Sequence, residues 1–176
     1  MATNTSNIFA GAAVVSIGNY VSQGGAGSLT DVGHMKAPVS LSPSFEDYEI
    51  KSERAFGTLK RIPIDGSLKL SVDLSEVTAE HLRIAFRQAS ANKTGTSPDF
   101  TLLIGDFTEQ YHQITVVATG PGTTGVRTAT LWRAYVEALG EIPFAKGEEQ
   151  HLALTFDCLY DDTVTTNDKF GKIVDA

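Results

Sequence analysis

Residues 120–125 form the stretch whose spacing comes closest to a nucleotide-binding motif. Their sequence, GPGTTG, fits the pattern G-x-G-x-x-G and follows a predicted strand, and Glu141 stands where a ribose-binding acid would be expected. A dinucleotide site also needs a helix directly after the glycines, because the helix N-terminus binds the pyrophosphate. The residues that follow, VRTATLW, are rich in β-branched side chains and predict a strand. A hairpin turn is therefore the favoured interpretation, and we expect no cofactor.

The remaining side chains that could do chemistry do not form a recognisable site. The four histidines show no H-x-H or H-E-x-x-H spacing, so a metal site would have to come entirely from long-range contacts. Asp161 and Asp162 lie in a turn-like segment, and no G-x-S-x-G, P-loop or EF-hand pattern occurs. The single cysteine, Cys158, excludes an internal disulfide and is predicted to be a small buried hydrophobe. We expect no catalytic residues, no metal and no enzymatic activity.

Composition predicts one globular domain over residues 1–176. The chain is 41% hydrophobic and 20% charged, which is ordinary for a protein with a sizeable core. Its net charge of -7 argues against a general nucleic-acid binder held by phosphate contacts. No run reaches the roughly 18 apolar residues of a membrane span, and no basic segment precedes an apolar core at the N-terminus. We therefore expect no membrane or signal segment, and synthesis in a reducing compartment.

The stretch 44–88 is the best organised part of the sequence. Polar and apolar side chains alternate in SFEDYEIKSE (44–53) and again in GSLKLSVDL (66–74), which predicts two strands with one apolar face each. The expected apolar face holds Tyr48, Ile50, Leu68, Leu70 and Val72. The expected polar face carries four charged residues, Asp47, Glu49, Lys69 and Asp73.

Residues 52–63 are predicted to join these strands as a long hairpin arm. The segment is too long for a two-residue turn and combines apolar with basic side chains, which is typical of a contact surface. The residues expected to make that contact are Arg54, Phe56, Leu59, Lys60 and Arg61. Because they have no evident place in a monomer core, we expect another subunit to cover them.

A helix is predicted over residues 78–90. Thr78 is a suitable N-cap, and Glu80 lies in the first turn, where the helix dipole favours an acid. One apolar face is formed at helical spacing by Leu82, Ala85, Phe86 and Ala89. Ile84 lies off this face. A helix of this length is not stable alone in water, so we expect the apolar face to pack on the sheet.

The rest of the chain predicts further strands separated by polar turns. They fall at 8–18, in 101–107 with its end at Ile104 and Gly105, and at 112–119, 126–139, 148–160 and 169–175, with a polar loop at 91–100. Residues 31–41 are predicted as an edge strand or an interrupted one, because Pro38 lies within them and Gly33 suggests a bulge. The expected fold is mainly β, an antiparallel β-sandwich or flattened barrel of roughly eight strands with the one helix packed on a sheet.

Four segments follow one another in a characteristic order. They are IFAGAAVVSIG (8–18), DVGHMKAPVSLSPSFEDYEIKSE (31–53), LKRIPIDGSLKLSVDLSEVTAEHL (59–82) and HLALTFDCLYDD (151–162). Together they resemble the major tail tube proteins of long-tailed bacteriophages, a family related to the tube protein of the type VI secretion system. Glu76, Thr78 and Glu80 match the E-x-T-x-E-like phrase that opens the family's helix. The resemblance covers nearly the whole chain and implies a β-sandwich with a flanking helix, whose subunits form hexameric rings stacked into a tube for genome delivery.

The resemblance also implies roles for the residues singled out above. The residues that would line the lumen are Asp47, Glu49, Lys69 and Asp73. An acidic excess there would repel DNA phosphates and let the genome pass without specific binding. The arm would join neighbouring subunits or rings. The implied partners are further copies of the chain and the tape measure, tail terminator and tail tip proteins, in a virion whose proteins are synthesised in the bacterial host cytoplasm.

Two other classes of protein fit the same patterns. A ring protein of a contractile secretion system would share the fold and the ring but not the virion. A monomeric β-sandwich binding module, such as a carbohydrate-binding or adhesin-like domain, would display a row of exposed aromatic side chains. The only tryptophan, Trp132, instead lies on a predicted strand face with Val126 and Val136, as though buried.

Overall fold

A computed structural model describes residues 13–22, 25–26, 28–51, 58–96, 98–119, 125–142 and 149–176. Its strands are β1 (Ala13–Ser22), β2 (Gly25–Ala26), β3 (Thr30–Asp31), β4 (Ser40–Lys51), β5 (Thr58–Leu74), β6 (Lys93–Thr96), β7 (Asp99–Leu102), β8 (Tyr111–Thr119), β9 (Val126–Leu139), β10 (Leu152–Cys158) and β11 (Gly171–Asp175). The one α-helix in the described residues is α1 (Ala79–Ala85), and a 3-10 turn follows at Ser90–Asn92. No helix in this part of the chain is long and apolar enough to cross a membrane.

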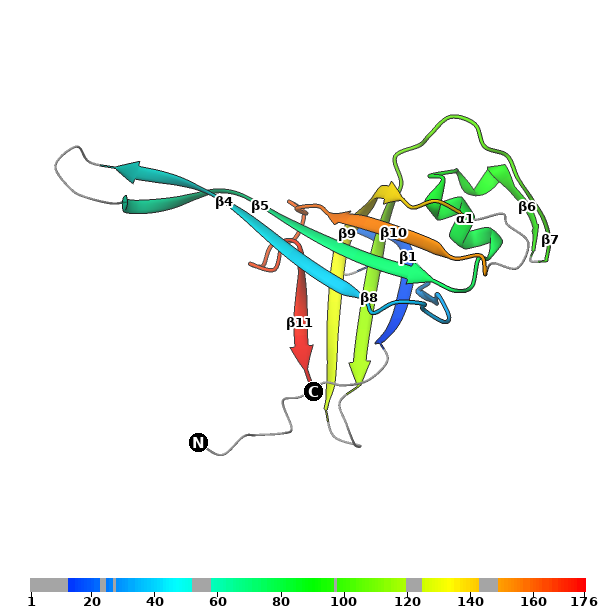
Figure 1. Cartoon of the computed structure of the whole chain (residues 1–176), viewed down its shortest axis with the longest axis horizontal. Helices are drawn as coiled ribbons and strands as arrows, with labels where there is room; N and C mark the ends of the chain where they lie inside the picture. Colours follow the sequence, from blue (N-terminus) through cyan, green and yellow to red (C-terminus); the bar gives the residue numbers. More distant parts are fainter. Residues whose placement is uncertain are drawn as a thin grey trace.

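Most strands belong to one antiparallel sheet with the order β2-β1-β8-β9-β10-β5-β4. Along one edge the long strand β9 has two partners in succession, since its first half pairs with β11 and its second half with β10. In Figure 1, strands β1, β8, β9 and β11 run across the direction of β4, β5 and β10, so the sheet forms two crossing layers. The predicted mainly β, sandwich-like fold is confirmed, and the described strands do not close into a barrel.

The core lies between the two layers and is formed by the inward faces of alternating strands. On β5 and β10, three pairs of buried side chains lie opposite one another: Leu70 and Phe156, Val72 and Leu154, Leu74 and Leu152. The other layer contributes Val15, Ile17, Ile114, Leu131 and Val136. Successive side chains of a strand point to opposite faces, which is why these segments alternate in sequence.

The β4–β5 hairpin projects beyond the sheet. β5 pairs with β10 only over residues 68–74, so its residues 58–67 have β4 as their one strand partner in the described chain. Figure 1 shows this ribbon extending away from the two layers. The predicted arm over 52–63 therefore needs correction, because residues 58–63 belong to strand β5. Residues 52–57, with Arg54 and Phe56, lie outside the described part of the chain.

The helix is shorter than the predicted 78–90. Thr78 is the N-cap, as predicted, and its Oγ1 accepts a hydrogen bond of 3.2 Å from the His81 backbone N–H. The helix ends at Ala85, and Arg87 has a φ of 51°. A residue in this left-handed conformation cannot continue a right-handed helix.

The inward face of the helix also differs from the expected one. Ile84, which the spacing placed off the apolar face, is buried in the core together with Ala85. Leu82 is partly buried and packs against that core. Phe86, the C-cap, and Ala89, beyond the helix, are half-buried outside the core cluster.

Of the two alternatives for residues 31–41, the interrupted strand is the one found, because β3 ends at Asp31, Gly33 has a φ of 78°, and β4 begins at Ser40. Two further predictions of local structure are corrected. Residues 91–100 are not a loop but contain most of the β6–β7 hairpin, a separate two-stranded sheet. The strand predicted to end at Ile104 and Gly105 ends at Leu102.

The segment GPGTTG connects two strands, not a strand and a helix. β8 and β9 are antiparallel neighbours on either side of it, and Thr119 lies opposite Val126. Residues 120–124 lie outside the described part of the chain. The strand predicted over 126–139 is confirmed, so the helix N-terminus that a dinucleotide site requires after the glycines is not formed here.

Candidate assembly interface

The projecting part of the β4–β5 hairpin has two unlike faces. Tyr48 lies opposite Ile62, and Ile50 lies opposite Lys60, so these four side chains share one face. Tyr48 is 60% exposed, and Ile50 and Ile62 are exposed as well. We call Tyr48, Ile50 and Ile62 the apolar hairpin face. Because a two-stranded hairpin is at best marginally stable alone in water, this face is suited to contact with another molecule.

The apolar hairpin face does not continue the core. Leu41 of β4 lies opposite the buried Leu70 and packs against the core. Strict alternation along β4 then places Tyr48 on the other side of the ribbon. On β5, Ile64 has no partner in the register, and this bulge brings Ile62 to the same side as Tyr48. Tyr48, Ile50 and Ile62 are therefore turned away from the face that packs on the core, whereas the exposed Phe45 remains on the Leu41 side of β4.

The other face of the hairpin is ionic. The Glu49 carboxylate lies 2.6 Å from Arg61 Nη2 and 3.4 Å from Lys51 Nζ, and it accepts a hydrogen bond of 3.2 Å from Thr58 Oγ1. The Thr58 hydroxyl, Lys51 and Arg61 together lower the pKa of Glu49. Asp47 lies on the same face and is exposed. Solvated pairs of this kind contribute little to folding stability, so the face remains charged and hydrated.

The structure separates residues that the sequence placed together on one lumen face. Asp47 and Glu49 lie on the side of β4 that carries Leu41. Lys69 lies opposite Ser42, which is on the other side of the ribbon, and Asp73 alternates with it on that side. The grouping is wrong because the apolar positions of β4 change sides between its body half and its projecting half. Tyr48 and Ile50, which were expected to pack on the body, are exposed for the same reason.

The outer face of β4, β5 and β10 carries small hydroxyl and charged side chains. Ser40 lies opposite Ser71, which in turn lies opposite Thr155, so one row of hydroxyls crosses three strands. We call this the polar sheet face, and its residues are Ser40, Ser42, Ser44, Ser67, Lys69, Ser71, Asp73, Ala153, Thr155 and Asp157. Only Lys69 and Asp73 of this set were predicted from the sequence, because strand order and register bring the others beside them.

Two polar contacts stabilise this face. The Lys69 ammonium lies 2.6 Å from a Glu137 carboxylate oxygen, and His151 Nδ1 lies 3.0 Å from Asp73 Oδ1. The hydrogen bond that the ammonium donates to Glu137 raises the pKa of Lys69, so the lysine is cationic at neutral pH. Glu137 thus neutralises the charge of Lys69, and the other charged residues of the polar sheet face, Asp73 and Asp157, are acids.

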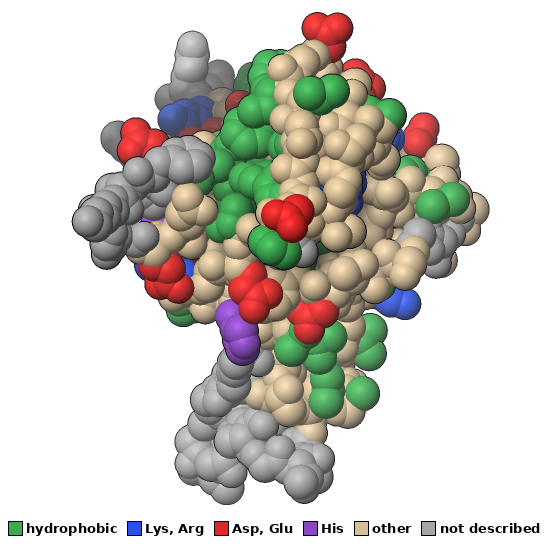
Figure 2. Space-filling model, turned by 90° about the vertical axis from the view of Figure 1, so that its right-hand side faces the viewer, with side chains coloured by type: hydrophobic (Ala, Val, Ile, Leu, Met, Phe, Trp, Pro, Cys, Tyr) green, Lys and Arg blue, Asp and Glu red, His purple; other side chains and the backbone are tan. Residues whose placement is uncertain are grey.

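A second exposed apolar surface lies in the loop between β7 and β8. Leu103, Ile104 and Phe107 are exposed, Phe107 by 70%. We call residues 103–107 the apolar loop. Figure 1 shows it above α1, at the end of the molecule opposite the hairpin, and Figure 2 shows hydrophobic side chains gathered on the upper part of this end. A hollow beside the loop is lined by Ala85, Phe86, Arg87, Phe107, Val136, Glu137 and Leu139.

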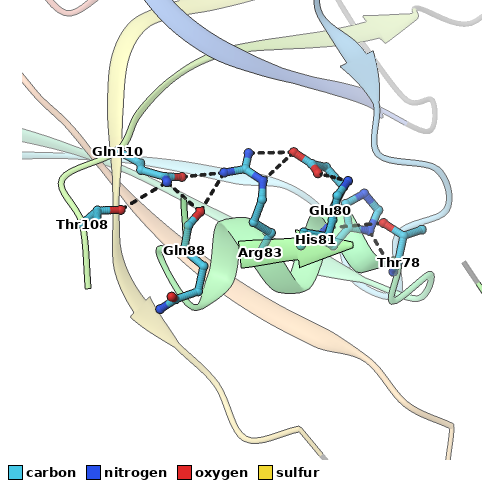
Figure 3. A network of polar contacts seen from close by, with 8 residues as sticks. Thr78, Glu80, His81, Arg83, Gln88, Thr108 and Gln110 are labelled. Carbon is cyan, nitrogen blue, oxygen red and sulfur yellow. Dashed lines mark hydrogen bonds and ion pairs between the residues drawn. The ribbon is translucent and has the colours of Figure 1, made fainter. Parts of the chain in front are cut away.

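A buried polar network lies beneath the apolar loop (Figure 3). Arg83 is only 2% exposed, and its guanidinium donates to Glu80 Oε1 at 2.6 and 2.9 Å, to the Gln88 carbonyl at 2.9 Å and to Gln110 Oε1 at 2.7 Å. Lys93 Nζ donates to the other Glu80 oxygen at 2.6 Å. Burial alone would raise the pKa of Glu80, but the hydrogen bonds from Arg83 and Lys93 outweigh it and lower the pKa to about 2. The buried guanidinium is therefore matched by an ionised carboxylate.

The same network reaches the loop backbone. The fully buried Gln88 accepts a hydrogen bond of 3.3 Å from the Gly105 N–H through its side-chain oxygen. The Arg87 carbonyl accepts from the Thr108 N–H and from its hydroxyl, both at 3.1 Å. The Leu103 N–H donates to the Asn92 carbonyl at 2.9 Å. The loop is thus fixed at its beginning, its middle and its end.

The buried titratable groups elsewhere do not form a reactive site. His112 is buried, and neither ring nitrogen has a hydrogen-bond partner in the described residues. Burial, with the nearby Arg83 charge, lowers the pKa of His112 to about 4. Burial and Asp157 raise the pKa of the Cys158 thiol to about 12, so it is not a nucleophile at neutral pH. Within the described ranges no three His, Cys, Asp or Glu side chains gather as metal ligands.

The one tryptophan is not an exposed binding platform. Trp132 is buried, and its Nε1 donates a hydrogen bond of 2.8 Å to the Asp168 carbonyl. The exposed aromatic rings of the described residues belong to Phe45 and Tyr48, on opposite sides of β4, to Phe107 on the apolar loop and to Tyr160 after β10. A planar aromatic row of the kind expected for a carbohydrate-binding module is not found among them.

Comparison with known proteins adds a fold relationship. No protein-family model and no curated protein matches the chain. The chain is similar to a chain of the 6-fold symmetrised baseplate of the anti-feeding prophage, with a TM-score of 0.52 and 10% identity over 100% of this chain and 97% of that one. The two share a fold. A chain of the sheath/tube terminator of the extracellular contractile injection system PVC, in its extended state, gives a TM-score of 0.48 and 13% identity over 94% and 93% of the two chains.

Proposed function

We propose that the chain is a ring-forming structural subunit of a phage-tail-like tube, in a virion tail or a related injection apparatus. The observation that carries the proposal is the apolar hairpin face, which projects from the body and is turned away from its own core. The fold shared with a component of a 6-fold symmetrised baseplate supports it. In this proposal six copies form a ring, rings stack into a tube, and a neighbouring copy covers each hairpin.

The polar sheet face is the proposed lining of the channel. Its hydroxyl side chains are short, and its acids Asp73 and Asp157, with the adjacent Glu137, outnumber the single cation Lys69. Such a surface repels phosphate and offers no long basic side chains to hold it, so duplex DNA could pass without specific binding. Asp47 and Glu49 are not part of this lining in the present proposal, because they lie on the ionic face of the hairpin. Tape measure, tail terminator and tail tip proteins remain the predicted partners of the assembled tube.

The hairpin provides the test of this function. Glu46 lies opposite Asp65, so residues 47–64 can be replaced by an Asn-Gly turn that joins the two strands directly. Because the removed part pairs with no other described strand, we expect the shortened chain to keep its melting temperature by circular dichroism. Electron microscopy at equal concentration should show rings or tubes for the full-length chain and only monomers for the shortened one.

Matched point variants separate the apolar hairpin face from general surface hydrophobicity. Tyr48→Ser combined with Ile62→Ser should abolish assembly, whereas Ile173→Ser, at an equally exposed position of β11, should leave it intact. A full-length chain that stays monomeric at high concentration, or a shortened chain that still forms tubes, would overturn the proposed function.

A further inference from the structure

The apolar loop combines exposed hydrophobic side chains with an unusually fixed backbone. Leu103, Ile104 and Phe107 face solvent. Loops with exposed side chains are usually the mobile parts of a protein. Here, however, hydrogen bonds tie the backbone at Leu103, Gly105 and Thr108 to the segment that follows α1.

The groups that fix the loop are themselves costly to bury. Arg83 and Gln88 are almost completely inaccessible. The Arg83 guanidinium has its partners in the network of Figure 3. The Gln88 side-chain amide donates to the Phe86 carbonyl and accepts from the Gly105 N–H. A buried guanidinium is tolerated only when its charge and its hydrogen bonds are matched. The result is an apolar surface held in one conformation before anything binds, which reduces the entropy lost on association.

We propose that the apolar loop is the docking surface for the hairpin of a neighbouring copy of this chain. The inference rests on the proposed function and names the two surfaces that meet. The apolar hairpin face would lie on Leu103, Ile104 and Phe107, and the Tyr48 ring would enter the hollow beside the loop, which is lined largely by apolar side chains.

Charge complementarity supports this pairing. Lys60 lies at the edge of the apolar hairpin face, opposite Ile50, and has no ion-pair partner in the described residues. Asp106 lies within the apolar loop and Glu109 lies just after it, and both are exposed. Docking of the hairpin on the loop would bring the Lys60 ammonium to the Asp106 carboxylate.

The two surfaces lie at opposite ends of one chain (Figure 1). A contact between different surfaces of identical subunits is heterologous, and such contacts form closed rings or continue as a helical stack. The proposed docking therefore has the symmetry that a ring or tube requires and that a two-fold dimer does not.

Cysteine cross-linking tests the contact directly. A variant with both Ile62→Cys and Leu103→Cys should form a ladder of covalently linked chains longer than dimers under mild oxidation, because each copy then carries both halves of the contact. The native Cys158 is buried and should stay unreacted. The matched control, Ile62→Cys with Ile173→Cys, should give no ladder, and neither should each single variant.

A charge exchange provides the second measurement. Lys60→Asp and Asp106→Lys, made singly, should each raise the protein concentration needed for assembly roughly tenfold, and the combined variant should restore it. Wild-type rings or tubes without a ladder, or a combined variant no better than the single ones, would overturn this docking while leaving the proposed function in place. A wild-type chain that never assembles would overturn the proposed function, and the absence of a ladder at high concentration would then overturn the docking as well.

Discussion

Arg83 and His112 are both buried polar side chains, but Arg83 is buried in its charged form and His112 in its neutral form. The Arg83 guanidinium has hydrogen bonds to Glu80, Gln88 and Gln110, so it stays charged. The His112 ring has no hydrogen-bond partner among the described residues, so it is buried in its neutral form. A buried polar group that loses its partners costs much more than a hydrogen bond between exposed groups contributes.

The network around Arg83 leads to a stability prediction. Arg83→Met should lower the free energy of unfolding by about 2–4 kcal/mol, because the Gln88 carbonyl and the Gln110 oxygen lose a donor while Glu80 stays partly exposed to water. Urea denaturation measures the change. The control is Arg127→Met, which removes an exposed pair with Asp175 and should cost much less. Equal losses of unfolding free energy in the two variants would show that the buried network contributes no more to stability than an exposed ion pair.

His112 predicts a pH dependence of folding. Its pKa is lowered from 6.5 to about 4 in the folded chain, so between these values the unfolded chain binds the proton more readily. The stability from this group is present in full above pH 6.5 and is lost as the pH falls toward 4, by roughly 3 kcal/mol in total. His112→Gln should flatten that part of the curve in urea titrations between pH 7 and 4. A wild-type curve as flat as the variant's would contradict the burial of a neutral ring.

Predictability at this scale depends on the sequence distance between partners. The N-cap at Thr78 could be predicted, because its partner His81 lies within the same turn. The contact from Arg83 to Gln110 spans 27 positions and depends on how the loop returns to the helix, so residue spacing contained no sign of it.

Among the elements, the long strands were predictable and their relative faces were not. Polar and apolar residues alternate in β5 and β10 because, over the residues where these two strands pair with each other, one side of each strand is turned to the core. β4 changes its apolar side halfway, between Leu41 and Tyr48, and only the register with β5 shows which side faces the core. Residues 91–100 form most of the β6–β7 hairpin despite their polar composition, with Gly95 at a φ of 82°.

The helix provides a test at the scale of one element. Ile84→Asp should lower the free energy of unfolding by about 4 kcal/mol or more, because it places a carboxylate in the core with no partner. Phe86→Asp should cost about half as much or less, since Phe86 is half-buried outside the core cluster. Both are measured by urea denaturation monitored by circular dichroism. The reverse order would mean that the other side of α1 packs on the sheet.

At the scale of the whole molecule, the polar sheet face decides between a conduit and a solid rod. If six copies turn this face inward, Ser71→Lys with Thr155→Lys should leave tubes intact and make them retain duplex DNA at low salt, with release at high salt. Labelled DNA that sediments with the tubes measures the effect, and Ser71→Asn with Thr155→Asn is the uncharged control. DNA retention no greater for the lysine variant than for the control would remove this face from the channel.

The two unpaired residues of β5 determine where the gene can lose a codon without changing the faces of the hairpin. Ile64 and Leu59 have no partner in the register of β4, so loss of the codon for Ile64 would remove a bulge and leave every remaining pair on its present side. Loss of a codon between positions 65 and 68 would instead shift the strand by one residue and exchange its two faces. Natural variation in the length of this hairpin should therefore accumulate at the bulges, where a gene can change its length without changing which surface the protein presents.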